Sequence, residues 1–569
     1  MAGFDPTRPF VLLDDVAAGT ARLFGDIAET VVAVVPGEVL PALDHLRAPG
    51  LWAGFIGFEA GYALEPALVP RAPPPKEPLL WFGRFRSEAA VNAAALLGSG
   101  PAAVGDVVPG IAQEAYDRRL ARVQDLITAG DIYQANVTFN ALVAVNGHPL
   151  HLYARLRAGS RAPYGALVFT GSLWLLSFSP ELFFRMDGRR LLARPMKGTA
   201  PRGFDATDDA ARASALRTDP KNRAENLMIT DLLRNDLSRV GSNVAVPALF
   251  DVETYPTVLQ MTSTITADAH PGVTAVDVVA WLFPCGSVTG APKIRAMQVI
   301  AEVEGAPRGV YTGSIGAISG EDAVFSVAIR TLVMAPGAAS ARLGLGSGIV
   351  ADGNAAEEWA ECLQKSAFLG RKPPPDLLET MRVEAGTVPA LGRHLARMAA
   401  TAAFLGVVFA EKTAKFAVLA AISAGFSGRL RLLVAPSGAI AVHLSPFPAT
   451  PDAISVALVP LPVAAEDWRL RHKTSDRGFY DSARAAAGAF ECVFFRPDGA
   501  LTEGSFTNVF VERGGILLTP PAALGLLPGV LRAQLLAQGR AVEANLTGED
   551  LADGFFIGNA LRGLIAAHL

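Results

Sequence analysis

The sequence predicts an α+β protein built from two units. Short apolar or alternating runs, which are typical of strands, occur in both halves at 173–178, 329–333 and 430–434. Longer stretches with helical periodicity, such as 223–240, are interspersed with them. Residues 371–376 include three consecutive prolines, which cannot continue a helix or donate to a sheet ladder. We therefore expect mixed units on either side of a proline-rich linker at 371–376.

The composition excludes several classes of protein. The 569 residues include 50 Lys and Arg and 54 Asp and Glu, so the formal net charge is −4. This balance argues against a partner that is a nucleic acid or an anionic membrane, because such proteins carry a basic excess. Hydrophobic residues make up 51%, which is too many for a disordered chain. Three cysteines without metal-ligand spacing cannot form a disulfide framework.

We expect neither membrane insertion nor export. No stretch offers the roughly 20 uninterrupted apolar residues that a membrane-spanning helix needs. Asp14 and Asp15 interrupt the place where a signal peptide requires an apolar core. The sequence therefore predicts a cytoplasmic protein.

Carboxylates occur on the apolar face of a predicted helix at 222–240. Glu225 and Asp236 fall within the apolar stripe of this helix. A carboxylate on a buried face is costly unless it is paired, protonated or bound to a cation. For this helix alone, a structural salt bridge or a capping contact is the favoured interpretation. The stripe comprises Met228, Ile229, Leu232, Leu233 and Val240.

A second predicted helix makes a metal site more probable than a structural ion pair. In 355–369, Glu358, Glu361 and Lys365 share one face. Two helices that each present acids could together hold a hard divalent cation, and Mg²⁺ takes oxygen ligands. With both helices present, we favour a magnesium site over a structural ion pair.

Two glycine-containing segments are candidate anion sites. Residues 285–293 place glycines and hydroxyls before a helix that begins at a proline, where free N–H groups favour negative charge. Residues 344–348 are glycine-rich, so the backbone there could approach a ligand closely. Each segment is also compatible with a simple tight turn.

Together these segments resemble the chorismate-utilising enzymes over most of residues 110–370. The resemblance implies a large α/β sandwich that binds chorismate and Mg²⁺ between its layers, with a β-rich flank at 1–110 and the catalytic domain at 111–370. The motifs that carry it are found at 131–136, 179–181, 195–199, 283–293, 311–313, 329–331 and 346–350.

The same resemblance assigns site residues. It implies that Glu225 and Glu361 bind the metal, with Glu358 beside them. The positions that match substrate-binding residues are Arg330, Tyr311, Gly348, Lys365, Thr289 and Glu358.

Lys197 indicates the branch of the family that the chain resembles. Aminodeoxychorismate synthases carry Lys at this position of the Pro-x-x-Gly-Thr motif, whereas anthranilate synthases usually carry Ala. Lys197 would add at C2 of chorismate as the C4 hydroxyl leaves, and ammonia would then add at C4 and expel the lysine. Glu181 matches the acid that protonates the departing hydroxyl. We expect burial or a neighbouring cation to keep Lys197 neutral; the alternative is a solvated surface lysine.

Two departures suggest what this half lacks. Gln260 stands where many relatives have His, and an amide cannot cycle a proton near neutral pH. We therefore expect this half to stop before pyruvate is eliminated. Cys285, Cys362 and Cys492 lack the Gly-x-Cys-x-Gly context of a glutaminase nucleophile. Ammonia would then come from solution or from a separate glutamine amidotransferase subunit.

Residues 375–569 resemble the class IV pyridoxal-phosphate enzymes, which have a smaller two-lobed fold, and we place this domain at 377–569. The resemblance implies that Lys473 forms a Schiff base with pyridoxal 5'-phosphate and that Glu503 pairs with the ring nitrogen. The matching motifs occur at 378–381, 393–397, 429–431, 472–474, 501–509, 527–532 and 558–563.

The resemblance also implies which residues bind the phosphate of the cofactor. It places the phosphate on Arg393 and on the backbone N–H groups of Val530 and Leu531, at the start of a predicted helix. It places Tyr480 near the ring. Ala560 stands where relatives often offer a phosphate-binding hydroxyl.

The combined expectation is a bifunctional enzyme of folate biosynthesis. Chorismate and ammonia would give aminodeoxychorismate, and loss of pyruvate would then give 4-aminobenzoate. Two sites on one chain would raise the local concentration of the intermediate. One rival pairs an anthranilate synthase-like half with an amino-acid aminotransferase, and another treats the C-terminal half as a non-catalytic interaction module. The sequence is compatible with an oligomer formed through the second domain.

Overall fold

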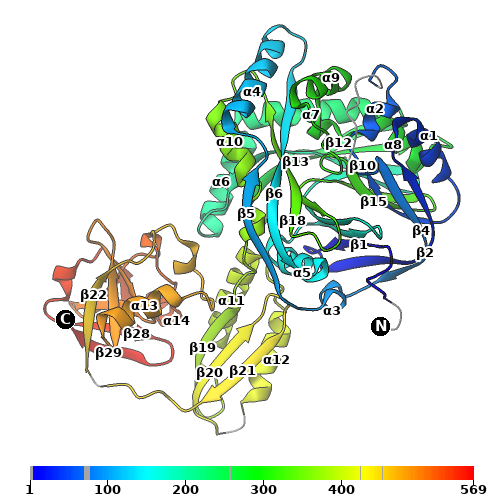
Figure 1. Ribbon diagram of the computed structural model, residues 1–569. Helices are drawn as coiled ribbons and strands as arrows, with labels where there is room; N and C mark the ends of the chain where they lie inside the picture. The colour runs from blue at the N-terminus through cyan, green and yellow to red at the C-terminus, as the bar shows by residue number, and fades with distance from the viewer. Residues whose placement is uncertain (1–3, 69–76, 256–257, 423–424, 452) are drawn as a thin grey trace. The chain divides into compact units, whose positions relative to one another are not determined.

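The computed structural model describes residues 4–68, 77–255, 258–422, 425–451 and 453–569. The chain forms two compact units, which Figure 1 shows by residue number. The first comprises residues 1–200, 215–254 and 259–373, and the second comprises 201–214, 255–258 and 374–569. Within the described ranges, no helix is both long and apolar enough to cross a membrane.

The first unit is built on a continuous path of antiparallel strands. In order of pairing, these strands are β5 (Ala102–Pro109), β6 (Gln134–Gly147), β18 (Ser340–Ile349), β17 (Thr331–Met334), β8 (Trp174–Ser179), β7 (Tyr164–Phe169), β1 (Phe10–Asp15), β2 (Thr20–Ala33), β4 (Leu80–Ala90), β3 (Leu51–Ile56), β15 (Ser314–Ser319), β16 (Asp322–Val327), β9 (Leu182–Asp187), β10 (Arg190–Arg194), β13 (Val258–Ala269) and β12 (Gly241–Thr254). Two short strands attach to it, β11 (Met196–Pro201) beside β13 and β14 (Gly290–Ala291) beside β6.

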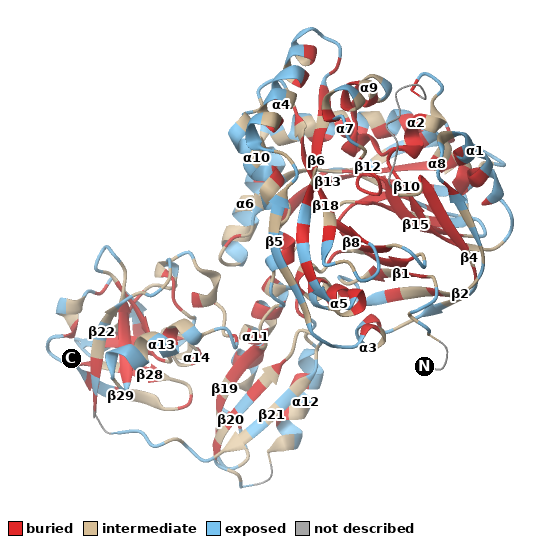
Figure 2. Ribbon diagram, viewed as in Figure 1, coloured by how far each residue is buried: buried red, intermediate tan, exposed pale blue. Residues whose placement is uncertain are grey.

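The inner strands of this sheet, such as β8 and β15, are buried on both faces, as Figure 2 shows for β15 in red, whereas β5 and β12 are largely half-buried or exposed. Alternate residues of a strand point to opposite faces. In β8, Leu176 and Phe178 belong to a core cluster that includes helix residues, whereas Leu175 packs in an inner cluster with strand residues such as Phe55 of β3. Helices cover the outer faces, and the expected α/β sandwich is confirmed. The helices of this unit are α1 (Pro36–His45), α2 (Ala60–Leu64), α3 (Ala93–Leu97), α4 (Gln113–Thr128), α5 (Pro149–Ser160), α7 (Pro220–Ser238), α8 (Ala275–Leu282), α9 (Lys293–Glu304) and α10 (Ala355–Gln364), with 3₁₀ turns η2 (Gly286–Val288) and η3 (Ala367–Gly370).

Helix α7 corresponds to the helix predicted at 222–240, but the face that it buries differs from the predicted one. It begins at Pro220, because Asp219 caps the helix by accepting a hydrogen bond from the Asn222 N–H. Its buried residues are Asn226, Ile229, Thr230, Leu233, Asp236 and Leu237, so Met228 and Leu232 of the predicted stripe lie at its edge. Asp236 forms an ion pair with Lys293 at 2.5 Å. For Asp236, the structural salt bridge was therefore the right interpretation.

The second unit has two lobes. The smaller lobe is an antiparallel sheet of β19 (Leu377–Val383), β20 (Gly428–Val434) and β21 (Ile440–Ser445) with helices α11 (Leu391–Leu405) and α12 (Glu411–Ala421). Helix α6 (Ala206–Thr218) contributes residues to both units. In order of pairing, the strands of the larger lobe are β24 (Leu501–Gly504), β23 (Glu491–Phe495), β22 (Ala453–Pro460), β29 (Gly563–His568), β28 (Phe555–Asn559), β25 (Asn508–Arg513), β26 (Ile516–Thr519) and β27 (Ala541–Glu543), accompanied by α13 (Gly478–Ala487), α14 (Val530–Ala537) and 3₁₀ turns η4 (Trp468–Leu470), η5 (Ala522–Leu524) and η6 (Gly548–Leu551).

Candidate active sites

Lys197 lies on β11, and buried polar groups fix its backbone. Asn226 Nδ2 of α7 donates to the Lys197 carbonyl at 3.2 Å, and Ser263 Oγ of β13 donates to Asn226 Oδ1 at 2.5 Å. Asn226 and Ser263 are almost completely buried, so water does not compete for these bonds. The Lys197 side chain is 18% exposed. The structure therefore does not support the alternative of a solvated surface lysine.

The amine of Lys197 lies among carboxylates from several elements. Its Nζ is 3.7 Å from Oε2 of Glu225 on α7. Its charge also acts on Glu181, which follows β8, and on Glu358 and Glu361 of α10. The candidate residues of separate motifs are thus brought to one place in the first unit.

Glu181 is a buried acid that can hold a proton near neutral pH. Its carboxylate accepts a hydrogen bond of 2.5 Å from Ser287 Oγ of η2. Burial raises the pKa of Glu181 to about 7, although the Ser287 hydrogen bond and the charges of Lys197 and Lys365 oppose the rise. A group with this pKa can serve as a general acid at neutral pH.

Two glycines of segment 344–348 make room for side chains of the protein itself. A Cβ on Gly348 would lie 2.7 Å from Lys197 Nζ and 2.8 Å from Gln134 Nε2. A Cβ on Gly344 would lie 2.0 Å from a ring carbon of Tyr311, which is buried. Gly348 thus lies beside the amine, and Tyr311 packs on the same strand.

Three other residues predicted to bind substrate are Lys365, Arg330 and Thr289, and they differ in their surroundings. Lys365 Nζ donates to the Gly346 carbonyl at 2.7 Å. Arg330 is half-buried and has a positive φ of 52°. The hydroxyl of Thr289 donates to the carbonyls of Cys285 and Gly286, so it supports the turn before α9.

The predicted magnesium ligands are present but are not gathered into a ready site. Among the described residues, no three His, Cys, Asp or Glu side chains form a cluster that could hold a metal. Glu225 faces Lys197, and Glu361 pairs with Lys365 at 2.8 Å. Burial raises the pKa of Glu358, whereas for the exposed Glu361 the charge and hydrogen bond of Lys365 outweigh partial desolvation and lower the pKa. Carboxylate oxygens suit Mg²⁺, but two of them would have to leave lysine partners, so the metal stays a prediction.

Gln260 helps to hold the strand that carries Lys197. Its Nε2 donates to the Gly198 carbonyl at 2.8 Å, and its Oε1 accepts from Thr199 Oγ1 at 2.9 Å. The amide of this buried side chain is thus engaged with β11.

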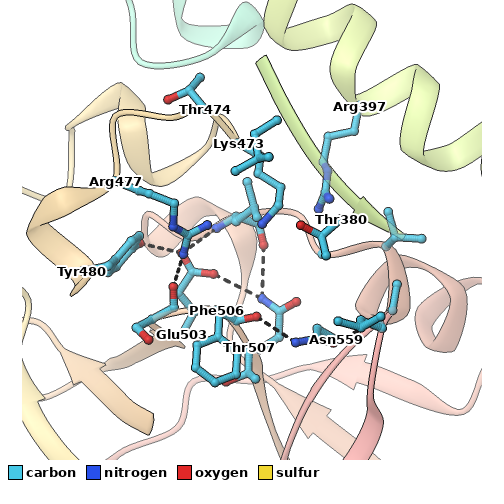
Figure 3. A pocket seen from close by; sticks show the side chains of 18 of the residues that line it. Thr380, Arg397, Lys473, Thr474, Arg477, Tyr480, Glu503, Phe506, Thr507 and Asn559 are labelled. Carbon is cyan, nitrogen blue, oxygen red and sulfur yellow. Dashed lines mark hydrogen bonds between the residues drawn. The ribbon is translucent and has the colours of Figure 1, made fainter. Parts of the chain in front are cut away.

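The second unit contains a cavity of about 380 Å³ around Lys473 (Figure 3). The Lys473 carbonyl accepts a hydrogen bond from the Leu378 N–H at the start of β19, which fixes the backbone of this lysine. Burial lowers the pKa of Lys473 to about 7, with further contributions from the charges of Arg477 and Arg397. The amine is therefore neutral in an appreciable fraction of molecules at neutral pH.

Glu503 lies in the same cavity and is held by several donors. Tyr480 Oη donates to it at 2.7 Å and the Leu527 N–H at 3.0 Å. Asn508 Nδ2 approaches it at 3.5 Å. Burial raises the pKa of Glu503 to about 7. Tyr480, which the sequence placed near the cofactor ring, thus contacts the carboxylate assigned to the ring nitrogen (Figure 3).

The structure does not place Arg393 at this cavity. Arg393 is exposed in the first turn of α11, whereas Arg397 lines the cavity. Four residues of helix move a side chain about 6 Å along the axis, which explains the difference. Arg397 pairs with Glu379 at 2.8 Å and donates to the Pro528 carbonyl at 3.1 Å.

The start of α14 supplies the other predicted phosphate contacts. Gly529 is the N-cap, and Gly529 and Val530 line the cavity. Leu531 lies in the first turn, where backbone N–H groups have no partner within the helix. Ala560 also lines the cavity and offers no hydroxyl.

This cavity fits pyridoxal 5'-phosphate. It presents an amine for the aldehyde, a buried carboxylate for the ring nitrogen and a helix N-terminus for the phosphate. Thr474, next to Lys473, has a buried Oγ1 with no hydrogen-bond partner in the described part of the chain. Sequence reasoning missed Arg397 and Arg477, although both lie within four residues of assigned positions.

Comparison with known families agrees with this arrangement. Residues 26–371 match the family described as chorismate binding enzyme. Residues 376–568 match the amino-transferase class IV family.

Individual relatives resemble the first unit. The aminodeoxychorismate synthase of Streptomyces griseus is 44% identical over 264 residues, which is 46% of this chain and 36% of that protein. Anthranilate synthase component 1 of Thermus thermophilus is 39% identical over 260 residues, or 45% of this chain and 56% of that protein. The matched region thus spans between about a third and somewhat over half of these relatives. The crystal structure of anthranilate synthase component I from Streptococcus pneumoniae superposes with a TM-score of 0.54 at 23% identity and covers 65% of this chain and 94% of that one. This last likeness concerns the fold alone.

Proposed function

The chain belongs to the chorismate binding enzyme family, and from this premise we propose that it makes 4-aminobenzoate from chorismate in two steps. The first unit would form 4-amino-4-deoxychorismate from chorismate and ammonia. The second unit, which matches the class IV amino-transferases, would remove pyruvate from that intermediate. The observation that carries the proposal is Lys197, whose amine lies among carboxylates in a chorismate-binding fold. Such a product would feed folate biosynthesis.

In the first reaction, two residues would act on chorismate. Lys197 adds through Nζ to C2, the ring double bond shifts, and the C4–O bond breaks. Glu181 gives its proton to the departing hydroxyl, which leaves as water. Ammonia then adds at C4, the C2–N bond to Lys197 breaks, and the surplus proton of ammonia returns to Glu181. Chorismate and ammonia thus yield aminodeoxychorismate and water.

Ammonia would come from a separate subunit or from solution. The three cysteines are buried, and none lies in a glutaminase motif. A relative from Klebsiella aerogenes that is named a component 1 enzyme supports a second component. We therefore propose a glutamine amidotransferase partner that delivers ammonia to the first unit.

Glu225, Glu358 and Glu361 would hold Mg²⁺ in the substrate complex. The metal would neutralise a carboxylate of chorismate. The present lysine contacts of Glu225 and Glu361 would then be exchanged for contacts to the cation.

In the second reaction, the residues of the cavity would move one proton and hold charge. Bound pyridoxal phosphate supplies an electron sink for the electrons of the broken C–H bond. Lys473 removes the C4 proton of aminodeoxychorismate, the C3–O bond breaks, and the proton passes to the leaving enolpyruvate to give pyruvate. Glu503 keeps the ring nitrogen of the cofactor protonated. Arg397 and the N-terminus of α14 hold its phosphate.

A product assay tests the proposal. The full chain is incubated with chorismate, ammonium, Mg²⁺ and pyridoxal phosphate, and the aromatic amine is identified by chromatography. We expect 4-aminobenzoate and pyruvate from the unaltered chain, and accumulation of aminodeoxychorismate from Lys473→Ala. Lys197→Ala should form neither product from chorismate but should still convert supplied aminodeoxychorismate. Equal loss of both reactions in Lys197→Ala would contradict separate sites.

The main rival is an anthranilate synthase joined to an amino-acid aminotransferase. It is favoured by the 39% identity to an anthranilate synthase component 1. The same assay distinguishes it, because this rival predicts the 2-amino isomer.

A further inference from the structure

Residues 201–209 lie in the part of the sequence that matches the chorismate binding enzymes, but they pack in the second unit. The class IV match, by contrast, begins at residue 376. This segment runs from the end of β11 into the first turn of α6. The second unit therefore contains side chains that the class IV part of the sequence does not supply.

Arg202 anchors this segment in the second unit. Its guanidinium pairs with Asp209 at 2.5 Å, and its side chain is only 9% exposed. It also donates to the Tyr255 carbonyl at 2.8 Å and to the Phe404 carbonyl at 3.0 Å. Phe404 lies in the last turn of α11, where carbonyls have no partner within the helix. Arg202 thus ties segment 201–209 to the C-terminal end of α11.

From Arg202, the contacts continue through two rings to the residue before Lys473. The Arg202 guanidinium lies over the Phe404 ring, 4.7 Å from its centroid. The Phe404 ring in turn stacks on the imidazole of His472, with centroids 4.2 Å apart and planes inclined by 18°. Cation–π and stacking contacts both depend on orientation. Together they fix the plane of the His472 ring.

A second contact of the segment reaches one residue further back along the chain. The guanidinium of Arg471 lies 4.0 Å from the ring centroid of Phe204. Its Nε is 3.6 Å from Oδ2 of Asp205, and the Arg471 side chain is buried. Segment 201–209 therefore contacts or braces both residues that immediately precede Lys473.

These contacts bear on the amine because His472 and Lys473 both line the cofactor cavity. The Leu378 N–H donates to the Lys473 carbonyl and so holds the backbone on one side of the lysine. The contacts of segment 201–209 hold the two residues on the other side. A reacting side chain works only when its surroundings keep it within about 0.5 Å of the productive position.

We infer that Arg202 and Phe204 are positioning residues for Lys473. They act through the side chains that they hold, and not by contact with the cofactor. Without them, residues 471–472 could shift, and the amine would move with them. The inference rests on the proposed role of Lys473 as the lysine that binds pyridoxal phosphate. It makes the second active site dependent on a segment outside the class IV match.

The test measures how fast the full chain captures its cofactor. Cofactor-free protein is mixed with saturating pyridoxal phosphate, and the visible absorption band is followed by stopped flow. In this step Lys473 Nζ adds to the aldehyde carbon, a C=N bond forms, and the aldehyde oxygen leaves as water. At about pH 9 the amine is neutral, because burial lowers the pKa of Lys473 to about 7. The rate then reports the position of the amine and not its ionisation.

Variants tie the capture rate to the named residues. Arg202→Gln and Phe204→Ala should each slow capture about tenfold or more, since misplacement of a reacting group by about 1 Å can cost about 100-fold. Arg202→Lys keeps a cation for the Phe404 ring and should recover most of the rate. Arg212→Gln is the matched control, because it removes an ion pair of α6, Arg212 with Asp208 at 2.8 Å, and leaves the contacts of Arg202 and Phe204 in place. It should not change the rate.

A second measurement separates positioning from folding. Arg202→Gln and Phe204→Ala should lower kcat for supplied aminodeoxychorismate about tenfold and change KM less than about threefold, at a temperature where calorimetry shows the second unit folded. A purely structural role would lower the Tm of that unit while leaving both kcat and the capture rate unchanged. That result would overturn the inference.

The outcomes also distinguish this inference from the proposed reaction. If the unaltered chain captures the cofactor but gives no 4-aminobenzoate, the proposed reaction fails, and slower capture in Arg202→Gln still supports the positioning role. If all variants capture the cofactor equally fast, the inference fails even when 4-aminobenzoate is formed. Absence of a visible band in the unaltered chain would overturn both.

Discussion

Burial sets the ionisation of the residues that would move protons in both reactions. The pKa values of Glu181, Lys473 and Glu503 are each brought to about 7, those of the acids by a rise and that of the lysine by a fall. Desolvation penalises the charged form in every case. Each group can therefore hold or release a proton at neutral pH, which a solvent-exposed glutamate or lysine does far less readily.

The first prediction concerns Glu181. The mechanism needs Glu181 protonated and Lys197 neutral, so the contribution of Glu181 to kcat/KM for chorismate at constant free ammonia should fall about tenfold per pH unit above about pH 7. Glu181→Gln should lower the rate by a factor of about 10²–10⁴ and abolish this fall in kcat/KM at high pH. Ser287→Ala removes a hydrogen bond that lowers the pKa of Glu181, so the fall in kcat/KM should begin at a higher pH. An unchanged pH profile in both variants would assign the proton to another group.

The second prediction concerns Gly348. Gly348→Ala would place a Cβ 2.7 Å from Lys197 Nζ and so displace the amine. We expect aminodeoxychorismate formation to fall about 100-fold or more, since misplacement by about 1 Å can cost that much. Conversion of supplied aminodeoxychorismate should not change. Gly25→Ala is the matched control, because its Cβ would meet only Ser87 Oγ at an ordinary 3.7 Å; comparable losses in the two variants would refute the close approach.

At the scale of elements, the start of α14 is the part on which cofactor binding depends most clearly. A Cβ on Gly529 would come within 1.8 Å of Asn508 Oδ1, and Asn508 Nδ2 donates to the Leu527 carbonyl at 3.1 Å. The turn before the helix would have to move. The backbone N–H groups assigned to the phosphate would move with it.

The third prediction follows from this contact. Gly529→Ala should raise the Kd for pyridoxal phosphate about tenfold or more, equivalent to about 1.4 kcal/mol, as measured by titration of visible absorption. Gly392→Ala, at a helix position with nothing near the added Cβ, should leave the Kd unchanged and stabilise the fold by about 0.4–1 kcal/mol. If the two variants bind the cofactor equally well, the helix N-terminus does not carry the phosphate.

Helices α7 and α11 show which features could be predicted from the sequence and which could not. Apolar periodicity predicted the helix at 222–240, which the structure has at 220–238, but it put Met228 and Leu232 in the buried stripe beside Ile229 and Leu233. It misplaced the buried face because Asn226 and Thr230 are buried through hydrogen bonds, which hydrophobicity does not register. Similarly, the motif at 393–397 located the right turn of α11. It could not choose between Arg393 and Arg397, because only tertiary packing determines which arginine reaches the cavity.

At the scale of the whole molecule, the two units have separate cores. As far as the structure describes the chain, the buried clusters of the first unit contain no residue of the smaller or larger lobe of the second. The proline-rich stretch lies where the units divide, at 373–374. No sequence feature indicated that 201–214 groups with the second unit, because this short segment carries no motif of its own.

Separate cores lead to the last prediction, for the thermal unfolding of the full chain. Calorimetry should show two transitions, and pyridoxal phosphate at about 100 times its Kd should stabilise only the unit that binds it, by about 2.7 kcal/mol. For a unit of about 200 residues this corresponds to a rise of roughly 5–10 °C in its Tm. The shift should shrink in Lys473→Ala, which loses the amine in the cavity, and should persist in Lys197→Ala, which alters only the first unit. If the cofactor raised both transitions equally, the units would unfold as one cooperative body, and changes made in one active site would then be expected to destabilise the other.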